Sequence, residues 1–165
     1  MFYLFYNSIN FARILEKGDF LTKEFYSYEK FREDISNSIP ILEKENFDAI
    51  IGISRGGLTF SHFLAENLDI RRVYSVGTIS YNETEKLDDL QLYGIPNFQN
   101  EKKILVADDI ADSGRTLQKI SQHLSKFSEI NFQTATIFYK ESSVFQPNFF
   151  FHKTENWIEF FWNPN

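Results

Sequence analysis

Three features are missing from the 165-residue sequence, and each absence excludes a class of protein. There is no cysteine, which excludes a disulfide framework and thiol chemistry. There is no run of basic residues and the net charge is -6, which argues against a general role at nucleic acids or membrane surfaces. No apolar run approaches transmembrane length, and the aromatic start of the chain lacks the basic residues of a signal peptide. We therefore expect a cytoplasmic protein.

The length of the chain predicts one domain with a sizeable core, residues 1–165, and no repeat or low-complexity linker occurs in it. Residues 1–23 are hard to interpret, and we treat them as an N-terminal extension. A helix is predicted from Glu29 to about Glu45, and Pro40 should kink or end it nearby. The polar run from Asn82 to about Gln91 predicts a long functional loop.

One stretch, "KILVADDIADSGRTLQKI" from residue 103 to residue 120, combines a strand, a turn and a helix. Its apolar residues Ile104–Ala107 predict a buried strand. Leu117, Ile120 and Leu124 recur at i, i+3 and i+7, which predicts one buried face of a helix. Between these elements we predict an acidic turn followed by a loop that contains two hydroxyls and a glycine.

The residues of this turn and loop predict a site for a phosphorylated sugar. A loop at a helix N-terminus offers free backbone N–H groups and the positive end of the helix dipole, which suit a phosphate. The carboxylates of Asp108 and Asp109 cannot bind phosphate, but they can hold ribose hydroxyls or share Mg²⁺ with a pyrophosphate. The loop residues are Asp112, Ser113, Gly114, Arg115 and Thr116.

An apolar strand that ends in two acids is also typical of the receiver domains of response regulators. Those domains carry a phosphorylatable aspartate on a later strand, and this sequence has no aspartate after Asp112. A plain acidic surface turn would leave the hydroxyls and the glycine unexplained. The pattern therefore favours a ligand site.

Three further apolar strands are each followed at once by polar residues. They are Phe47–Ile53 before Ser54–Gly57, Val73–Ile79 before Ser80 and Tyr81, and Phe132–Tyr139 before Lys140. Glycines such as those in Ser54–Gly57 let backbone amides approach an anion, although such a turn can also be only a tight connection. In an open parallel α/β sheet, ligands bind beyond the carboxyl ends of the strands. We therefore expect all four polar elements to meet at one edge of one sheet.

The central stretch resembles the phosphoribosyl-pyrophosphate (PRPP) signature of the type I phosphoribosyltransferases: an apolar strand, two acids, two residues, then Asp-Thr/Ser-Gly-x-Thr. The resemblance runs from about Phe25 to Trp162. Within the family, the sequence is most similar to the bacterial xanthine-guanine enzymes. It implies an open, mostly parallel sheet flanked by helices, with a small C-terminal hood for the base at about residues 140–165.

The resemblance also implies a role for each site residue. Asp108 and Asp109 would bind the ribose hydroxyls, directly or through Mg²⁺, and Asp112 would be the general base for the purine ring proton. The 5′-phosphate would lie in the loop of Ser113, Gly114, Arg115 and Thr116. The pyrophosphate would be received by Arg55, Gly56 and Gly57, in a loop where the Arg55–Gly56 peptide can be cis.

Further implied roles concern the lid and the base. Ser80 and Tyr81 resemble the start of the mobile loop that closes over PRPP, but the arginine that related enzymes often carry there for pyrophosphate is missing. The loop has only Lys86, and which residue takes the role of that arginine stays open. Lys140 would donate to the purine O6, with a solvated lysine at a strand end as the alternative. The pattern "NWIEFFW" implies that Trp157 stacks on the base and that the backbone of Ile158 bonds its edge.

Together these roles imply a purine salvage enzyme that transfers the phosphoribosyl group of PRPP to a 6-oxopurine, with Mg²⁺ as cofactor. Its partners would be PRPP and a purine base, without nucleic acid or membrane, in a homo-oligomer (a dimer or a tetramer). Two alternatives stay open. The acceptor could be orotate, uracil or adenine, or the chain could be a PRPP-sensing regulatory module without catalysis.

Overall fold

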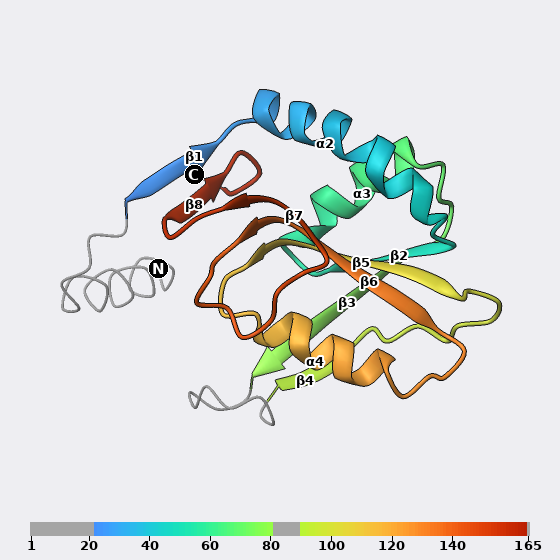
Figure 1. Ribbon diagram of the computed structural model, residues 1–165. Coiled ribbons are helices and arrows are strands. Elements are labelled where there is room, and N and C mark those ends of the chain that lie inside the picture. The colour runs from blue at the N-terminus through green and yellow to red at the C-terminus, as the bar shows by residue number, and fades with distance from the viewer. Residues whose placement is uncertain (1–21, 81–89, 165) are drawn as a thin grey trace, which may run out of the picture. The chain divides into compact units, whose positions relative to one another are not determined.

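The computed structural model describes residues 22–80 and 90–164 (Figure 1). The chain divides into two units. The larger unit comprises Ser27–Thr154, and the smaller one joins the residues up to Tyr26 with Glu155–Asn165.

A six-stranded sheet lies at the centre of the larger unit, in the order β4-β3-β2-β5-β6-β7. Its neighbouring strands pair in parallel except β3 and β4, which are antiparallel. The predicted open, mostly parallel sheet is therefore confirmed, while the edge strands β4 and β7 were not predicted. The strands are β2 (Ala49–Ile53), β3 (Val73–Ser80), β4 (Leu90–Tyr93), β5 (Lys103–Ala111), β6 (Asn131–Tyr139) and β7 (Phe149–Lys153).

Helices cover both faces of this sheet: Figure 1 shows α2 and α3 on one side and α4 on the other. Their bounds are α2 (Tyr28–Leu42), α3 (Gly57–Asn67) and α4 (Arg115–Leu124), with the short 3₁₀ helix η1 (Glu43–Glu45) after α2. The helix α2 begins after Ser27, whose hydroxyl accepts a hydrogen bond from the Lys30 amide. It ends two residues after Pro40, which confirms the predicted end near that proline.

The core of the larger unit is formed by the predicted apolar stripes. Burying an aliphatic or aromatic side chain of this size contributes about 1.5–3 kcal/mol, so these stripes hold the helices on the sheet. The strands contribute β-branched residues that are buried on both faces, as expected for parallel strands covered by helices. The buried helix residues include Phe31, Ile35 and Leu42 of α2, Phe60 and Leu64 of α3, and Leu117, Ile120 and Leu124 of α4.

The smaller unit contains a two-stranded parallel sheet of β1 (Lys23–Tyr26) and β8 (Trp157–Phe160). Aromatic rings pack along it: Tyr26 meets Phe160 edge-on at 5.9 Å between centroids, and Phe160 stacks on Trp162 at 4.6 Å. The aromatic residues of this unit thus pack against one another.

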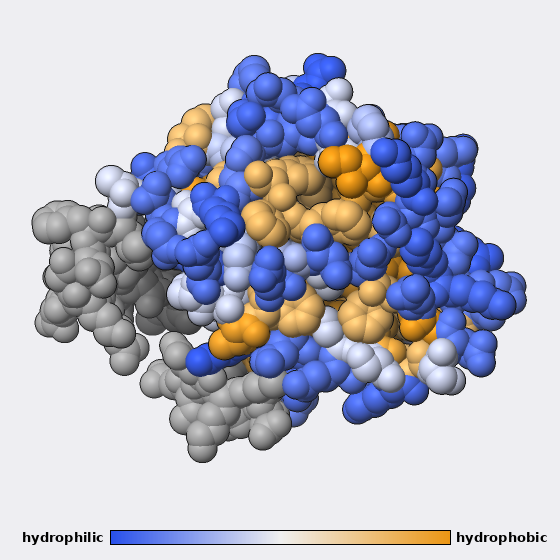
Figure 2. Space-filling view, in the orientation of Figure 1, coloured by the Kyte–Doolittle hydropathy of each residue, from blue (hydrophilic) through white to orange (hydrophobic). Residues whose placement is uncertain are grey.

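On the face seen in Figure 2, hydrophilic residues surround a central apolar patch. A groove of about 400 Å³ lies between α2 and β7 and is lined by Ile41, Leu42 and the three phenylalanines 149–151, with polar residues of α2 beside them. One of these, Asp34, is buried. None of the described helices has the length and apolarity needed to cross a membrane.

Candidate active site

The carboxyl ends of β2, β3, β5 and β6 meet at one edge of the sheet, as predicted, because these strands are mutually parallel. Backbone bonds tie the following residues to neighbouring strands. The amide of Ser54, after β2, donates to the Val76 carbonyl of β3 at 2.8 Å, and the amide of Lys140, after β6, donates to the Ala111 carbonyl of β5 at 3.1 Å. The order of strands therefore brings the ends of these four strands, with the polar residues that follow β2, β5 and β6, to one sheet edge.

The predicted acidic turn after Ala107 is wrong, because β5 continues through both acids to Ala111. Acidic residues are depleted in strands, so the sequence favoured a turn there. The pairing with β6 overrides that preference and extends to the Ala111–Tyr139 pair, with Asp108 opposite Thr136. As a result Asp108 and Asp109 are held on a strand rather than on a loop.

The two glycines at the start of α3 lie directly against these acids. A Cβ atom on Gly56 would lie 2.0 Å from Oδ2 of Asp109, and one on Gly57 would lie 2.6 Å from the Ala107 carbonyl oxygen and 2.8 Å from the Asp108 Cα. Neither position has room for a side chain. The glycines therefore let the Ser54–Gly57 loop approach the acidic strand end, in addition to the expected exposure of backbone amides.

Burial and repulsion make ionisation of the acidic pair unfavourable. Burial raises the pKa of Asp108 well above its ordinary value, and the neighbouring Asp109 charge raises it further. Burial also raises the pKa of Asp109, although the amide of Ile110 donates to its carboxylate at 2.8 Å. Within residues 22–80 and 90–164, no lysine or arginine forms an ion pair with either acid. The pair therefore suits a ligand that brings positive charge or hydroxyl donors.

The loop before α4 is held by the chain that follows β6. Gly114 has φ +73°, and a Cβ there would lie 2.1 Å from the Ser143 hydroxyl and 2.8 Å from the Phe145 amide nitrogen. The Val144 amide donates to the Ser113 carbonyl at 3.0 Å. The first intrahelical bond runs from the Gln118 amide to the Gly114 carbonyl, so the amides of residues 115–117 lie at the open N-terminus of α4. This is the predicted arrangement for binding a phosphate.

Lys140 and Asp112 form an ion pair across this edge. Nζ of Lys140 lies 3.0 Å from Oδ1 of Asp112, and the lysine side chain is 9% exposed while the aspartate is 56% exposed. The alternative of a solvated lysine at a strand end is therefore wrong. Its ammonium is held under the surface by an acid that can itself face a ligand.

One detail of the resemblance needs correction. The structure has a cis peptide bond in the Ser54–Gly57 loop, but it joins Ser54 to Arg55 and not Arg55 to Gly56. The family pattern can be aligned with a short loop of this composition one residue earlier or later. The resemblance therefore identified the loop but not which of its peptide bonds is cis.

The structure gives no contact of the remaining predicted residues with this site. Tyr81 and Lys86 lie outside the described residues, and only the backbone of Ser80 is described, at the end of β3. Trp157, which is 50% exposed, and Ile158, which is buried, belong to the smaller unit. The lid and base contacts of these residues stay predictions.

Sequence reasoning missed Tyr93, whose hydroxyl lies 3.4 Å from the Ser54 hydroxyl. Its strand β4 pairs with β3, so that Tyr93 stands opposite Gly77. The alternating pattern "LQLY" after the polar run was the one available signal for this strand. A strand of four residues gives too short a pattern to place its side chains.

Comparisons with known proteins agree with this geometry. Residues 27–165 match a family model described as the phosphoribosyl transferase domain. The chain is 31% identical over 125 residues to the xanthine-guanine phosphoribosyltransferase of Idiomarina loihiensis, which covers 74% of this chain and 74% of that protein. It resembles the solved xanthine-guanine-hypoxanthine phosphoribosyltransferase of Helicobacter pylori with a TM-score of 0.77 and 34% identity, over 86% of this chain and 94% of that chain.

A solved purine phosphoribosyltransferase of Pyrococcus horikoshii shares the fold, with a TM-score of 0.73 at 22% identity, over 87% of this chain and 95% of that one. The family model spans well over half of the sequence and includes the four strand ends described above. The chain therefore belongs to the phosphoribosyl transferase domain family.

Proposed function

We propose that this phosphoribosyltransferase is a purine salvage enzyme. It transfers the phosphoribosyl group of PRPP to guanine, xanthine or hypoxanthine and releases a nucleoside monophosphate and pyrophosphate. The relatives named for xanthine-guanine and xanthine-guanine-hypoxanthine transfer support a 6-oxopurine acceptor. Catalysis rather than sensing alone is supported by Asp112, which is in place beside the phosphate loop.

The observation that carries this proposal is the Lys140–Asp112 ion pair, 3.0 Å long, at the edge where the acidic strand and both loops meet. An ammonium is a donor only, so Lys140 suits the O6 acceptor of a 6-oxopurine. A carboxylate is an acceptor, so Asp112 suits the ring nitrogen proton of the same base. The pair thus presents one donor and one acceptor to the base.

PRPP binding is assigned to the remaining polar elements. Asp108 and Asp109 bind the ribose hydroxyls, and the open N-terminus of α4 with the hydroxyls of Ser113 and Thr116 binds the 5′-phosphate. The Ser54–Gly57 loop binds the pyrophosphate through its backbone amides and Arg55. This division is supported by the close packing of Gly56 and Gly57 on the two acids, because the sugar and the pyrophosphate are neighbouring groups of PRPP.

The acidic pair also fits Mg²⁺. Its donors are carboxylate oxygens, the ligands that Mg²⁺ prefers, and burial raises the pKa values of both acids, so a bound cation would favour their ionised form. Among the described residues no group of three or more acidic, histidine or cysteine side chains forms a protein-only metal site. That agrees with an ion held by one or two carboxylates together with substrate oxygens and water. When bound, the ion would offset the negative charge of the pyrophosphate.

The reaction forms one bond and breaks another at C1′ of the ribose. The purine ring nitrogen bonds to C1′, the bond from C1′ to the pyrophosphate oxygen breaks, and the electron pair leaves with pyrophosphate. Asp112 accepts the ring proton, a role that typically contributes about 10²–10⁴-fold. The other residues hold the two reactants in line, so positioning and electrostatic stabilisation supply most of the catalysis.

The test is a base panel. Purified protein is given PRPP, Mg²⁺ and each nucleobase in turn, and pyrophosphate release is recorded. We expect release with at least one 6-oxopurine and at least about tenfold less with adenine, because the adenine amino group is itself a donor and offers Lys140 no acceptor on the base. Release with orotate, uracil or adenine as the best acceptor would contradict the proposal.

Two lysine variants sharpen this test. Lys140→Met should reduce the preference for 6-oxopurines over adenine. Lys153→Met is the matched control, because Lys153 is the last residue of the next strand, β7, but is 56% exposed and pairs with Glu141. The control should leave the preference unchanged.

A further inference from the structure

Tyr93 is built into the fold by a gap left in the neighbouring strand. It stands opposite Gly77 in the antiparallel pair of β3 and β4. A Cβ on Gly77 would lie 2.2 Å from the Cζ and hydroxyl atoms of the Tyr93 ring, so the ring occupies the space where any side chain of residue 77 would be. An aromatic ring laid over a glycine in the adjacent strand fixes strand register. The direction of the ring is therefore set by backbone geometry.

The ring carries its hydroxyl to the start of the Ser54–Gly57 loop. The Ser54 hydroxyl lies 3.4 Å from the Tyr93 hydroxyl and donates to the Val76 carbonyl at 3.2 Å. The Ser54 hydroxyl has one hydrogen, which this carbonyl takes, so Tyr93 is the donor to Ser54. The amide of Ser54 donates to the same carbonyl at 2.8 Å. Ser54 is thus fixed to β3 by two bonds and to β4 by a third.

We propose that Tyr93 is a positioning residue for PRPP: through the hydroxyl of Ser54 it holds the Ser54–Gly57 loop in the conformation that receives the pyrophosphate group. This inference rests on the proposed function and adds a residue to it. Tyr93 acts through Ser54 and touches no reacting atom. Tyr93 is 45% exposed, so it contributes little to the core. Its role is therefore assigned to the hydrogen bond of its hydroxyl.

The two ligands of the site separate this role from a general contribution to folding. PRPP carries the pyrophosphate, whereas the nucleoside monophosphate product carries only the 5′-phosphate, which is assigned to the loop before α4. A change confined to the Ser54–Gly57 loop must therefore weaken PRPP and spare the product. A general loss of structure would weaken both.

The experiment compares Tyr93→Phe with wild type by calorimetric titration of PRPP with Mg²⁺ and of guanosine monophosphate, together with Tm. The variant keeps the ring over Gly77 and removes only the hydroxyl. The Kd for PRPP should rise about two- to tenfold, the effect of one neutral hydrogen bond, while the Kd for the nucleotide stays unchanged. Ser54→Ala should raise the Kd for PRPP as well, and the double variant should be no worse than Ser54→Ala alone.

Tyr74→Phe is the matched control on the same sheet. Its hydroxyl donates to Glu101 at 2.5 Å and not to Ser54, so its loss should lower Tm without changing the ratio of the two Kd values. If Tyr93→Phe binds PRPP as wild type does, or loses both ligands equally, the inference is overturned. If the wild type itself neither binds PRPP nor releases pyrophosphate with any base, the proposed function fails first.

Discussion

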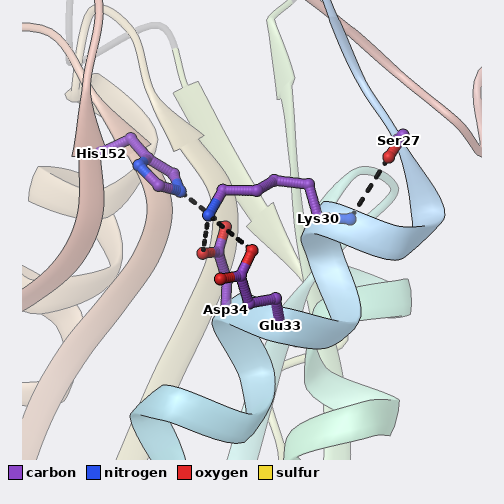
Figure 3. Close-up of polar contacts among 5 residues, drawn as sticks. All are labelled: Ser27, Lys30, Glu33, Asp34 and His152. Carbon is purple, nitrogen blue, oxygen red and sulfur yellow. Dashed lines mark hydrogen bonds and ion pairs between the residues drawn. The ribbon is translucent and has the colours of Figure 1, made fainter.

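The acidic side chains of this protein lie in two contrasting surroundings. Asp34 of α2 is buried but paired: Nζ of Lys30 lies 3.1 Å from one of its oxygens, and Nε2 of His152, on β7, lies 2.6 Å from the other (Figure 3). Asp108 and Asp109 of β5 are also partly buried, but their nearest charged neighbours are each other. One acid joins a helix to the edge of the sheet, whereas the other two repel.

Glu101 belongs with Asp34. Its carboxylate accepts hydrogen bonds from the Tyr74 hydroxyl and from the amides of Gln99 and Asn100, and it pairs with Arg72 at 2.7 Å. The bond from Tyr74 is the main cause that lowers the pKa of Glu101 to about 2. Asp34 and Glu101 thus show that this fold can surround a buried acid with hydrogen-bond donors and a basic partner. Asp108 and Asp109, which have no lysine or arginine partner among the described residues, lie at the sheet edge where the ligand site is proposed, as expected when function is favoured over stability.

The largest effect on activity should come from neutralising Asp108 and Asp109. The double variant Asp108→Asn/Asp109→Asn should lower phosphoribosyl transfer by about 10²-fold or more, because the sugar and the metal lose both carboxylates. At neutral pH its Tm should rise by about 2–4 °C, the shift produced by roughly 1 kcal/mol, because the raised pKa values make the ionised pair oppose folding. Transfer assays and calorimetry measure the two effects.

Asp69→Asn is the control for this variant. The Asp69 side chain is 86% exposed and pairs only with an exposed arginine, so neither activity nor Tm should change. A double variant that is both inactive and less stable than wild type would refute the contrast, because the pair would then be a structural element.

Asp112 is intermediate between the two kinds of acid, since it is paired with Lys140 but more than half exposed. Asp112→Asn should lower turnover by roughly 10²-fold, the usual effect of losing a general base, while PRPP binding stays largely intact. Single-turnover kinetics and PRPP titration separate the two quantities. Near wild-type turnover would remove Asp112 from the mechanism.

Neutralising a satisfied acid should have the opposite pattern. Asp34→Asn removes the charge shared by Lys30 and His152 and should cost about 1–3 kcal/mol, a fall in Tm of about 2–12 °C, with the Kd for PRPP unchanged. Glu33→Gln is the matched control, because Glu33 pairs with the same lysine but is 62% exposed. Equal losses of Tm in the two variants would show that the burial of Asp34 is unimportant.

Much of the larger unit could be predicted from the sequence because its signals are local. Apolar runs identified β2, β3, β5 and β6, and the 3.6-residue spacing of Leu117, Ile120 and Leu124 identified the buried face of α4. The convergence of the polar elements followed from one topological rule about parallel sheets. These inferences need no knowledge of distant contacts.

The parts that were not predicted depend on such contacts. The extension of β5 through its acids requires the register with β6, and the short edge strand β4 is defined by its pairing with β3. His152, one of the two partners of Asp34, is 118 residues away on β7. It lies in a run of aromatic residues without the alternation of apolar and polar residues that predicts a strand. Similarly, nothing in the sequence indicated that Lys140 would be buried against Asp112.

The smallest predicted effect distinguishes the two kinds of acid by the sign of their pH dependence. The pKa of Glu101 is lowered from 4.5 to about 2 in the folded protein, so its stabilising contribution is complete above about pH 4.5 and is lost as the pH falls toward 2. The raised pKa values of Asp108 and Asp109 act oppositely, because protonation relieves their repulsion and favours folding as the pH falls toward their ordinary value near 3.8.

Urea unfolding of wild type and Glu101→Gln between pH 6 and pH 3 should therefore show a difference in unfolding free energy that shrinks as the pH falls. The variant Asp108→Asn/Asp109→Asn should be more stable than wild type at pH 6, and this excess stability should also shrink as the pH falls. The two differences in unfolding free energy therefore have opposite signs. A difference for Glu101→Gln that stays constant across this range would mean that the bond from Tyr74 does not depend on the charge of Glu101.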